Sequence, residues 1–245
     1  MRRKTGTTSH AREAGRLLAS NERAFDAEIV RSALSFLGQF YRPLTGADLA
    51  DTGKPFAWVP EIIRARVKDV GREVPPFQLS QPETLEECST LTTVLRIAIP
   101  DLQELGDRNS KVDAETRDAK HEWLAKKLGG LQFSSSPVYR GRKWQMVTIP
   151  ALFSVEHCLA YAMFLMHEDR WGFRDRIHLC PYRRKADSPT HFEPDHWFLD
   201  FDLDATGALK PGPPQRFCSA AHANAYRQRE WRRSQLGAGA PRKGK

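Results

Sequence analysis

The feature that most constrains this fold lies near the carboxyl end, where a thiol and an imidazole are four positions apart. Residues 216–222 read Arg-Phe-Cys-Ser-Ala-Ala-His. At the start of a helix, this spacing brings the side chains of Cys218 and His222 to one face. A thiolate and an imidazole together supply half of the ligands of a tetrahedral zinc site. We therefore expect a metal ion to fix the start of the helix that follows.

The net charge of +8 is concentrated at the two ends of the chain. Residues 216–245 contain eight Lys and Arg and one acid, residues 1–23 contain six and two, and residues 24–215 carry a net charge of −3. Basic ends indicate either solvated tails or contact with polyanions. The expected final helix carries four arginines, namely Arg227, Arg229, Arg232 and Arg233.

We predict that these arginines bind the phosphates of nucleic acid, because a dense run of positive charge attracts a polyanion. The four side chains do not share one helical face. A solvated surface, with Tyr226 and Trp231 packed on the preceding module, is therefore the alternative.

The cysteines and the apolar runs indicate the compartment. The four cysteines, Cys88, Cys158, Cys180 and Cys218, show no disulfide-framework spacing. No stretch reaches the roughly 18 apolar residues that span a bilayer, and no secretory signal follows the first basic residues. We expect a soluble, cytoplasmic protein without a membrane partner, whose reduced thiols can bind metal. Cys88 lies on the apolar stripe of an expected helix, so we expect it to be buried.

Apolar periodicity predicts a mainly helical domain over residues 20–170, after a disordered basic tail at 1–19. Candidate helix caps are Ser20 or Asn21, Asp113 and Ser154. The expected helices span 20–41, 61–70, 83–99, 113–128 and 154–167, and residues 131–149 form a small β-hairpin that turns near Arg140.

Residues 171–235 are predicted to form a second, zinc-finger-like module, followed by a basic tail at 236–245. Residues 176–182 and 196–201 have the pattern of strands, and the basic helix begins after Cys218. The expected fold class is therefore α+β, mainly α. It consists of a helical amino-terminal domain with a small hairpin, then a ββα module of the treble-clef type.

The module resembles the carboxyl-terminal zinc fingers of bacterial CGNR-type proteins. The resemblance is carried by a helix at 154–167, a knuckle at Cys180-Pro181-Tyr182, the pair Trp197-Phe198, and the close Phe217-Cys218-Ser219 before an Asn- and Arg-rich helix. It covers the chain from about Arg142 onward. It implies one structural zinc ion, DNA as the partner and a role in transcription regulation.

The sequence departs from that pattern at two ligand positions. Arg183 stands where the knuckle would have its second Cys, and His222 stands where the last Cys is expected. Cys180, Cys218 and His222 then supply three ligands of the four that a structural zinc site needs. We expect His196 as the fourth, because a strand follows it, and His191 is the alternative. A degenerate finger without zinc, held by packing of Trp197, Phe198 and Phe217, is also open.

Two other functions remain open at this point. His196, Asp200, Asp202 and Asp204 alternate along one segment and would share one side of a strand. Such a set could hold a divalent ion for a metal-dependent phosphodiesterase or nuclease, although a half-exposed edge strand explains the same pattern.

A non-catalytic interaction protein with an acidic partner is the other possibility. No Gly-rich phosphate loop, His-Glu-x-x-His motif or nucleophile elbow occurs. We therefore predict a binding protein and no enzyme, with a small ligand or a protein partner for the helical domain.

Overall fold

The computed structural model describes residues 21–39, 51–68, 78–106, 111, 113–140, 143–181, 197–204, 206–210 and 215–238. Its helices are α2 (Glu22–Gln39), α4 (Val59–Lys68), α5 (Leu85–Gly106), α6 (Ala114–Leu128), α7 (Val155–Glu168) and α8 (Ala220–Ala238), with short 3-10 turns η1 (Lys54–Phe56) and η2 (Arg174–Arg176). Its strands are β1 (Phe133–Arg140), β2 (Lys143–Pro150), β3 (Ile177–Leu179) and β4 (Trp197–Leu199). The described part is mainly helical with two small antiparallel sheets, which confirms the coarse fold class.

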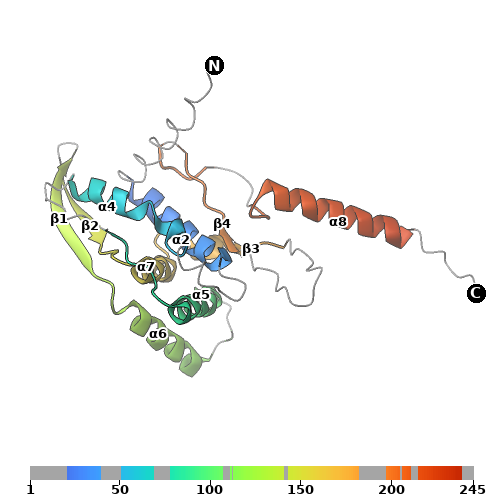
Figure 1. Ribbon diagram of the computed structural model, residues 1–245, viewed down its shortest axis with the longest axis horizontal. Coiled ribbons are helices and arrows are strands. Elements are labelled where there is room, and N and C mark those ends of the chain that lie inside the picture. Colours follow the sequence, from blue (N-terminus) through green and yellow to red (C-terminus); the bar gives the residue numbers. More distant parts are fainter. Residues whose placement is uncertain are drawn as a thin grey trace, which may run out of the picture.

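Helix α2 lies at the centre of the core, between α7, β4 and η1 (Figure 1). Its fully buried side chains include Phe25, Ile29 and Phe36. Helix α7 is buried along most of its length. The β3–β4 pair contributes Ile177 and Leu199 to the same apolar cluster as the helices. A continuous core therefore reaches from α2 into the region predicted as a second module, and the division at residue 171 stays a prediction.

The predicted helix starts agree with the structure because each has a local cap. The Asn21 side chain accepts the Ala24 N–H at 3.1 Å, Asp113 accepts the Thr116 N–H at 2.8 Å, and Ser154 accepts the His157 N–H at 3.1 Å. Such caps satisfy amide donors that have no partner within the helix. None of the described helices combines the length and the apolar composition needed to cross a bilayer.

Helix α5 is longer than expected. The sequence predicted an end at Ile99, before Pro100, yet the helix continues to Gly106. Proline removes one backbone donor, but Leu102 lies on the same stripe as Leu95 and Ile99 and is 1% exposed. Burial of that side chain, together with the 2.8 Å bond from the Gln103 amide to the Ile177 carbonyl, holds the extra turns in place.

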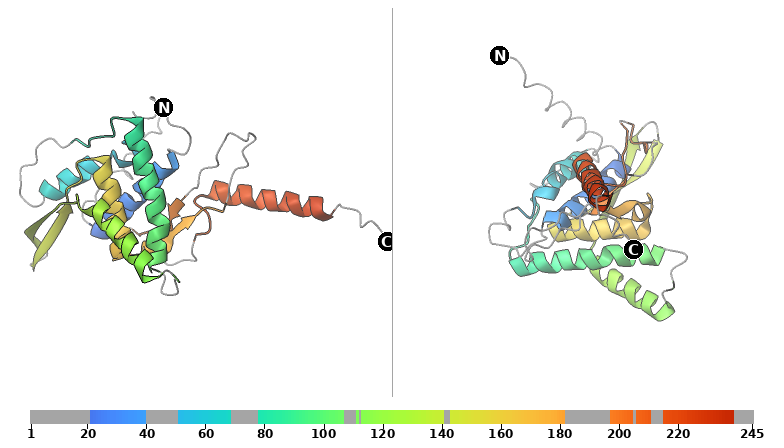
Figure 2. Two further views of the ribbon diagram at one scale, coloured as in Figure 1. Left: turned by 90° about the horizontal axis from the view of Figure 1, so that it is seen from below. Right: turned by 90° about the vertical axis from the view of Figure 1, so that its right-hand side faces the viewer.

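The β1–β2 hairpin projects from the helical body on the side away from α8 (Figure 1). Its register pairs Phe133 with Pro150 at the base and Arg140 with Lys143 near the turn, as the sequence indicated. Strands β3 and β4 pair Ile177 with Leu199. Helix α8 extends away from the body in Figure 1 and in the left view of Figure 2.

The loop after β4 lies against the start of α2. Asp204 Oδ1 accepts the N–H groups of Thr206 at 2.8 Å and Ala208 at 3.0 Å, which closes the turn. Gly207 has φ of 79°, a conformation that side chains rarely adopt. A Cβ atom at this position would also overlap the side-chain amide of Asn21. The segment between β4 and α8 is thus fitted closely to the cap of the central helix.

A buried carboxylate connects α2 to α7 and to the turn after it. Asp26 is 1% exposed and accepts hydrogen bonds from the Tyr161 hydroxyl at 2.9 Å and the Trp171 indole N–H at 2.8 Å. Burial raises the pKa of Asp26 to about 6, although both hydrogen bonds oppose the shift. Ionisation of this group therefore opposes folding.

We predict that Asp26→Asn removes a pH dependence of stability. The folded pKa of about 6 lies above the ordinary value of 3.8, so the stabilising protonation is complete below pH 3.8 and is lost as pH rises through 6. Across that window, wild type should lose about 3 kcal/mol of unfolding free energy relative to the variant. Urea unfolding of both proteins at several pH values measures this, and a constant difference between them would contradict it.

Candidate metal centre

Three of the four predicted ligands converge at the start of α8. The Cys218 sulfur lies 2.8 Å from His222 Nδ1, and the Cys180 sulfur lies 3.7 Å from the same nitrogen. All three ligand atoms lie within 4.8 Å of one another. Cys180 is buried, and Cys218 and His222 are half-buried. Among the described residues, this is the one group of His, Cys, Asp and Glu side chains with a geometry suited to a metal ion.

Each ligand is placed by a separate local element. Cys180 directly follows β3, whose first residue, Ile177, is 2% exposed in the core. Cys218 lies in the bend before α8. The Ser219 hydroxyl accepts the His222 N–H at 3.2 Å, and this capping interaction fixes the first turn that carries His222. The sequence motif contains Ser219, but its capping role becomes evident only in the structure.

The donor atoms fit a tetrahedral ion of zinc size. Zinc lies about 2.3 Å from a thiolate and about 2.0 Å from an imidazole nitrogen, which separates such donors by about 3.5 Å. The 3.7 Å between Cys180 and His222 matches that spacing, and the 2.8 Å between Cys218 and His222 is shorter. A small movement of Cys218 would bring this second pair to the same spacing. Two sulfurs and an imidazole suit zinc better than magnesium or calcium, which prefer oxygen.

The Cys218 thiol resists ionisation in the absence of a cation. Burial and the neighbouring Cys180 thiol raise the pKa of Cys218 to about 11. A bound divalent cation reverses this effect, because it stabilises the thiolate form directly. Cys218 is thus a poor nucleophile without a metal ion, whereas its position beside Cys180 and His222 suits it to be a ligand.

The expected fourth ligand lies outside the described residues. His196 and its alternative His191 both fall in the segment between 181 and 197. The described end of this segment is Trp197, the first residue of β4. The fourth ligand therefore stays a prediction.

Packing alone also supports the strand pair, as the zinc-free alternative requires. Phe198 is 9% exposed, and Trp197 packs against the core cluster. The Phe217 ring lies 5.2 Å from the Tyr226 ring, and the Arg216 guanidinium lies 5.8 Å from both ring centroids. A measurement of the metal content of the purified protein distinguishes the zinc-free alternative from an occupied zinc site.

Helix α8 carries the predicted nucleic-acid-binding arginines. Arg227 and Arg232 are exposed and Arg229 is half-buried, while the side chain of Arg233 lies outside the described residues. The Arg227 guanidinium donates to the Asn224 side chain at 3.5 Å. Tyr226 packs on Phe217 as the solvated-surface alternative expected, but Trp231 is 63% exposed. An exposed indole beside arginines adds a flat apolar surface to the charged helix.

The acidic residues proposed for a nuclease are engaged separately. Asp200 Oδ2 accepts the Gln215 N–H at 2.8 Å, and Asp202 lies 3.8 Å from the Arg31 guanidinium. Asp204 closes its own turn, and the pKa of its carboxyl is lowered by hydrogen bonds from Thr206 and Ala208. The strand β4 ends at Leu199, so the expected alternation does not extend through these positions. Within the described residues, they form no cation site.

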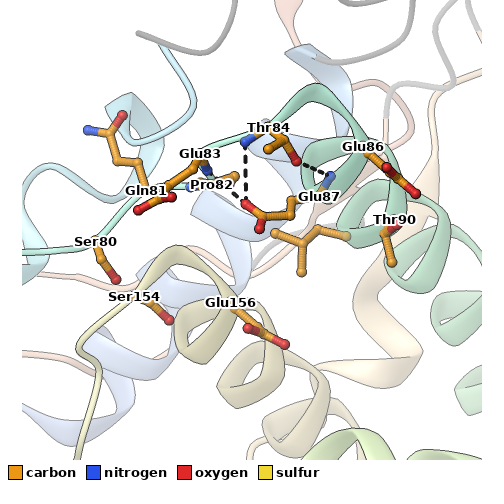
Figure 3. Close-up of a pocket in the computed structure, with 11 residues that line it drawn as sticks. Ser80, Gln81, Pro82, Glu83, Thr84, Glu86, Glu87, Thr90, Ser154 and Glu156 are labelled. Atoms are coloured by element: carbon orange, nitrogen blue, oxygen red, sulfur yellow. Dashed lines mark hydrogen bonds between the residues drawn. The ribbon is translucent and has the colours of Figure 1, made fainter.

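A surface pocket of the helical domain could take the predicted ligand. It has a volume of about 690 Å³, lies at the amino ends of α5 and α7, and is lined by Glu83, Glu86, Glu87 and Glu156 among others (Figure 3). Glu87 Oε2 accepts the N–H groups of Glu83 at 2.8 Å and Thr84 at 3.4 Å, and the Thr84 hydroxyl accepts the Glu87 N–H at 3.1 Å. This reciprocal capping box accounts for Glu87 structurally. A ligand of the helical domain stays a prediction.

Comparison with known proteins returned no match: no model of a protein family, no curated protein and no solved structure is significantly similar to the chain. The resemblance to CGNR-type fingers therefore rests on sequence motifs alone and stays a prediction.

We predict that Cys218→Ala removes bound zinc, because a structural ion needs four ligands and this variant lacks one of them. Zinc should fall from one ion per chain to near zero, with a loss of thermal stability. The measurement is elemental analysis of the purified protein, combined with thermal unfolding. Cys88→Ala is the control, because Cys88 is a fully buried thiol remote from the ligand set in sequence. Equal zinc in the Cys218 variant and wild type would remove this residue from the site.

Proposed function

We propose that this chain is a zinc-stabilised nucleic-acid-binding protein, with DNA as its partner and transcription regulation as its role. The single observation that carries the proposal is the convergence of Cys180, Cys218 and His222 at the first turn of a projecting basic helix. An ion there would join the end of β3 to the start of α8. Its role is structural, since it orients the arginines without taking part in a reaction.

The shape and charge of α8 support contact with a duplex. An α-helix fits the major groove of B-form DNA when its sides are open to the two phosphate backbones. Helix α8 extends from the body (Figure 2), and Arg227 and Arg232 are exposed on different sides of it. Arginines on several sides of a groove-bound helix can reach both backbones. Arginines on several sides of a helix are less suited to binding a flat acidic protein surface, which only one side of the helix could contact.

The regulatory role is supported by the resemblance and by the architecture. The resemblance implies a helical sensing domain followed by a DNA-binding finger. In this chain, Leu199 of β4 and Ile177 of β3 pack into the core formed by α2 and α7. A change in the packing of the helical domain would therefore shift β3 and β4, which form the base of the proposed finger. Fold alone does not define a function, so the DNA target must be found by selection.

We predict that the double variant Arg227→Ala with Arg229→Ala weakens DNA binding and its salt dependence. Each lost phosphate contact lowers the slope of log K against log salt by about 0.9, so the slope should fall by about 2. Fluorescence anisotropy with a labelled duplex at several salt concentrations measures this. Arg117→Ala, an exposed arginine of α6, is the matched control.

An unchanged slope in the double variant would contradict a role for α8 in binding phosphate. Equal losses with DNA and with heparin, and no sequence enrichment in a selection from random duplexes, would instead favour a non-catalytic interaction protein.

We predict that His196 is the fourth zinc ligand. His196→Ala should then lower zinc affinity by orders of magnitude in a competition with a chromophoric chelator, whereas His191→Ala should leave it unchanged. The reverse result would assign His191. If both variants bound zinc with the affinity of wild type, neither histidine would be a ligand.

A further inference from the structure

Two thiols that are far apart in the sequence, those of Cys180 and Cys218, lie side by side in the structure. Their sulfurs belong to the group whose ligand atoms all lie within 4.8 Å of one another, and both cysteines are free. Each sulfur also lies near His222 Nδ1, at 3.7 Å from Cys180 and 2.8 Å from Cys218. Besides binding a metal ion, such a pair can form a disulfide.

The geometry permits that bond with a short movement. A disulfide places its two sulfurs about 2.05 Å apart, so a pair within 4.8 Å must approach by less than about 3 Å. Cys180 follows β3, which the core holds through Ile177. Cys218 lies in the bend before α8 and belongs to no helix or strand. Its backbone can therefore adjust without breaking the hydrogen bonds of a regular element.

The two thiols differ in their access to solvent. Cys180 is 1% exposed, whereas Cys218 is half-buried. A small oxidant therefore reaches Cys218 first, and Cys180 lies behind it. Redox-sensing cysteines typically have this arrangement, in which an accessible thiolate lies beside a second cysteine that resolves the oxidised sulfur.

The other two cysteines of the chain are poor targets for the same oxidant. Cys88 and Cys158 are both 0% exposed. Burial raises the pKa of each of these thiols, and a protonated thiol reacts slowly. Oxidation by a small molecule should therefore be selective for the pair at the start of α8.

We propose that Cys180 and Cys218 are the site of a reversible disulfide, which a peroxide forms and a dithiol reduces, and that this oxidation releases the metal ion and weakens DNA binding. The effects on the ion and on DNA rest on the proposed function. The pairing of the two thiols does not, because it depends only on their proximity.

The reaction balances with hydrogen peroxide as the one co-reactant. Thiols that bind zinc are deprotonated, and the thiolate is the form that a peroxide oxidises. The Cys218 sulfur attacks one peroxide oxygen, the O–O bond breaks, and a sulfenic acid and hydroxide form. The Cys180 thiolate then attacks the Cys218 sulfur, so the S–S bond forms, the S–O bond breaks and a second hydroxide leaves. The two sulfurs lose two electrons, and the peroxide gains them.

The disulfide would remove two ligands at once. Of the group of three, only His222 then remains to bind a cation, and a structural zinc ion needs four ligands. The bond also brings the sulfurs closer together than on a shared zinc ion, where they lie about 3.8 Å apart. Helix α8 begins beside β3 (Figures 1 and 2). A closer approach of Cys218 to Cys180 would therefore change the direction of the helix that carries the arginines.

The test treats the zinc-loaded full chain with hydrogen peroxide. A chromophoric chelator should report release of about one zinc ion per chain. Mass spectrometry of an unreduced digest should show a peptide that joins Cys180 to Cys218. In anisotropy with a labelled DNA duplex, the affinity should fall on oxidation, and dithiothreitol with added zinc should restore it.

Two variants show whether the pairing is specific. Cys180→Ser should form no disulfide at Cys218, because a hydroxyl cannot replace the resolving thiol. Cys88→Ala is the matched control, since Cys88 is also a free thiol but lies outside the ligand group. Its cross-link and its zinc release should equal those of wild type. The cross-link in wild type depends on neither variant, so a folding defect in Cys180→Ser leaves the test decisive.

Zinc release without the joined peptide would overturn the inference. So would a disulfide between two chains, seen as a dimer in non-reducing electrophoresis, or an unchanged DNA affinity in the fully cross-linked chain. If the chain binds zinc and DNA but peroxide forms no cross-link, the proposed function survives and this inference fails. If the cross-link forms in a chain that binds neither zinc nor DNA, the pairing of the thiols stands and the proposed function fails.

Discussion

The packing of α2 against both α7 and β4 is the interaction on which the rest of the structure depends. One face of α2 buries Phe25 and Ile29 in the helical core, and the same core receives Leu199 from β4. The strand pair β3–β4 has three residues in each strand, too few to be stable alone. It is held because its apolar side chains are buried against the helices. The position of Cys180, and hence of the candidate metal centre, follows from that burial.

The candidate metal centre joins a part of the chain that the core holds in place to a part that the core does not hold. Cys180 is carried by a strand that is already fixed, whereas Cys218 and His222 begin a helix that extends from the body. Packing of Phe217 on Tyr226, at 5.2 Å, orders the first turns of α8. A metal ion would add a covalent-strength link between these two parts. Such a link would orient a helix that has little apolar surface of its own.

Local signals allowed much of the fold to be predicted from the sequence. The caps at Asn21, Asp113 and Ser154 act within one turn, so residue type and spacing are sufficient to find them. The extension of α5 past Pro100 could not be found this way, because it depends on burial of Leu102 against elements distant in sequence. The Asp26 cluster was missed for the same reason. Its partners, Tyr161 and Trp171, are brought together only by the packing of α2 on α7.

In the candidate site, too, the features set by local spacing could be predicted and those set by distant contacts could not. The pairing of Cys218 with His222 follows from helical spacing, but the approach of Cys180 was inferred from a family pattern, and the structure confirms it. The acidic alternation at 200–204 misled because it assumed a longer strand. Asp204 instead closes a turn around Gly207. The exposure of Trp144 at 72% could not be read from a hairpin pattern, which leaves open which face is covered.

The close fit of Gly207 against Asn21 has a consequence for how this chain can vary. Any larger residue at 207 would meet both an unfavourable backbone conformation and the amide that caps the central helix. Variation in the segment between β4 and α8 is thus restricted at one point by a helix nearly two hundred positions earlier in the chain. An alanine at 207 would have to displace the Asn21 side chain, and the cap of the first turn of α2 would be lost with it.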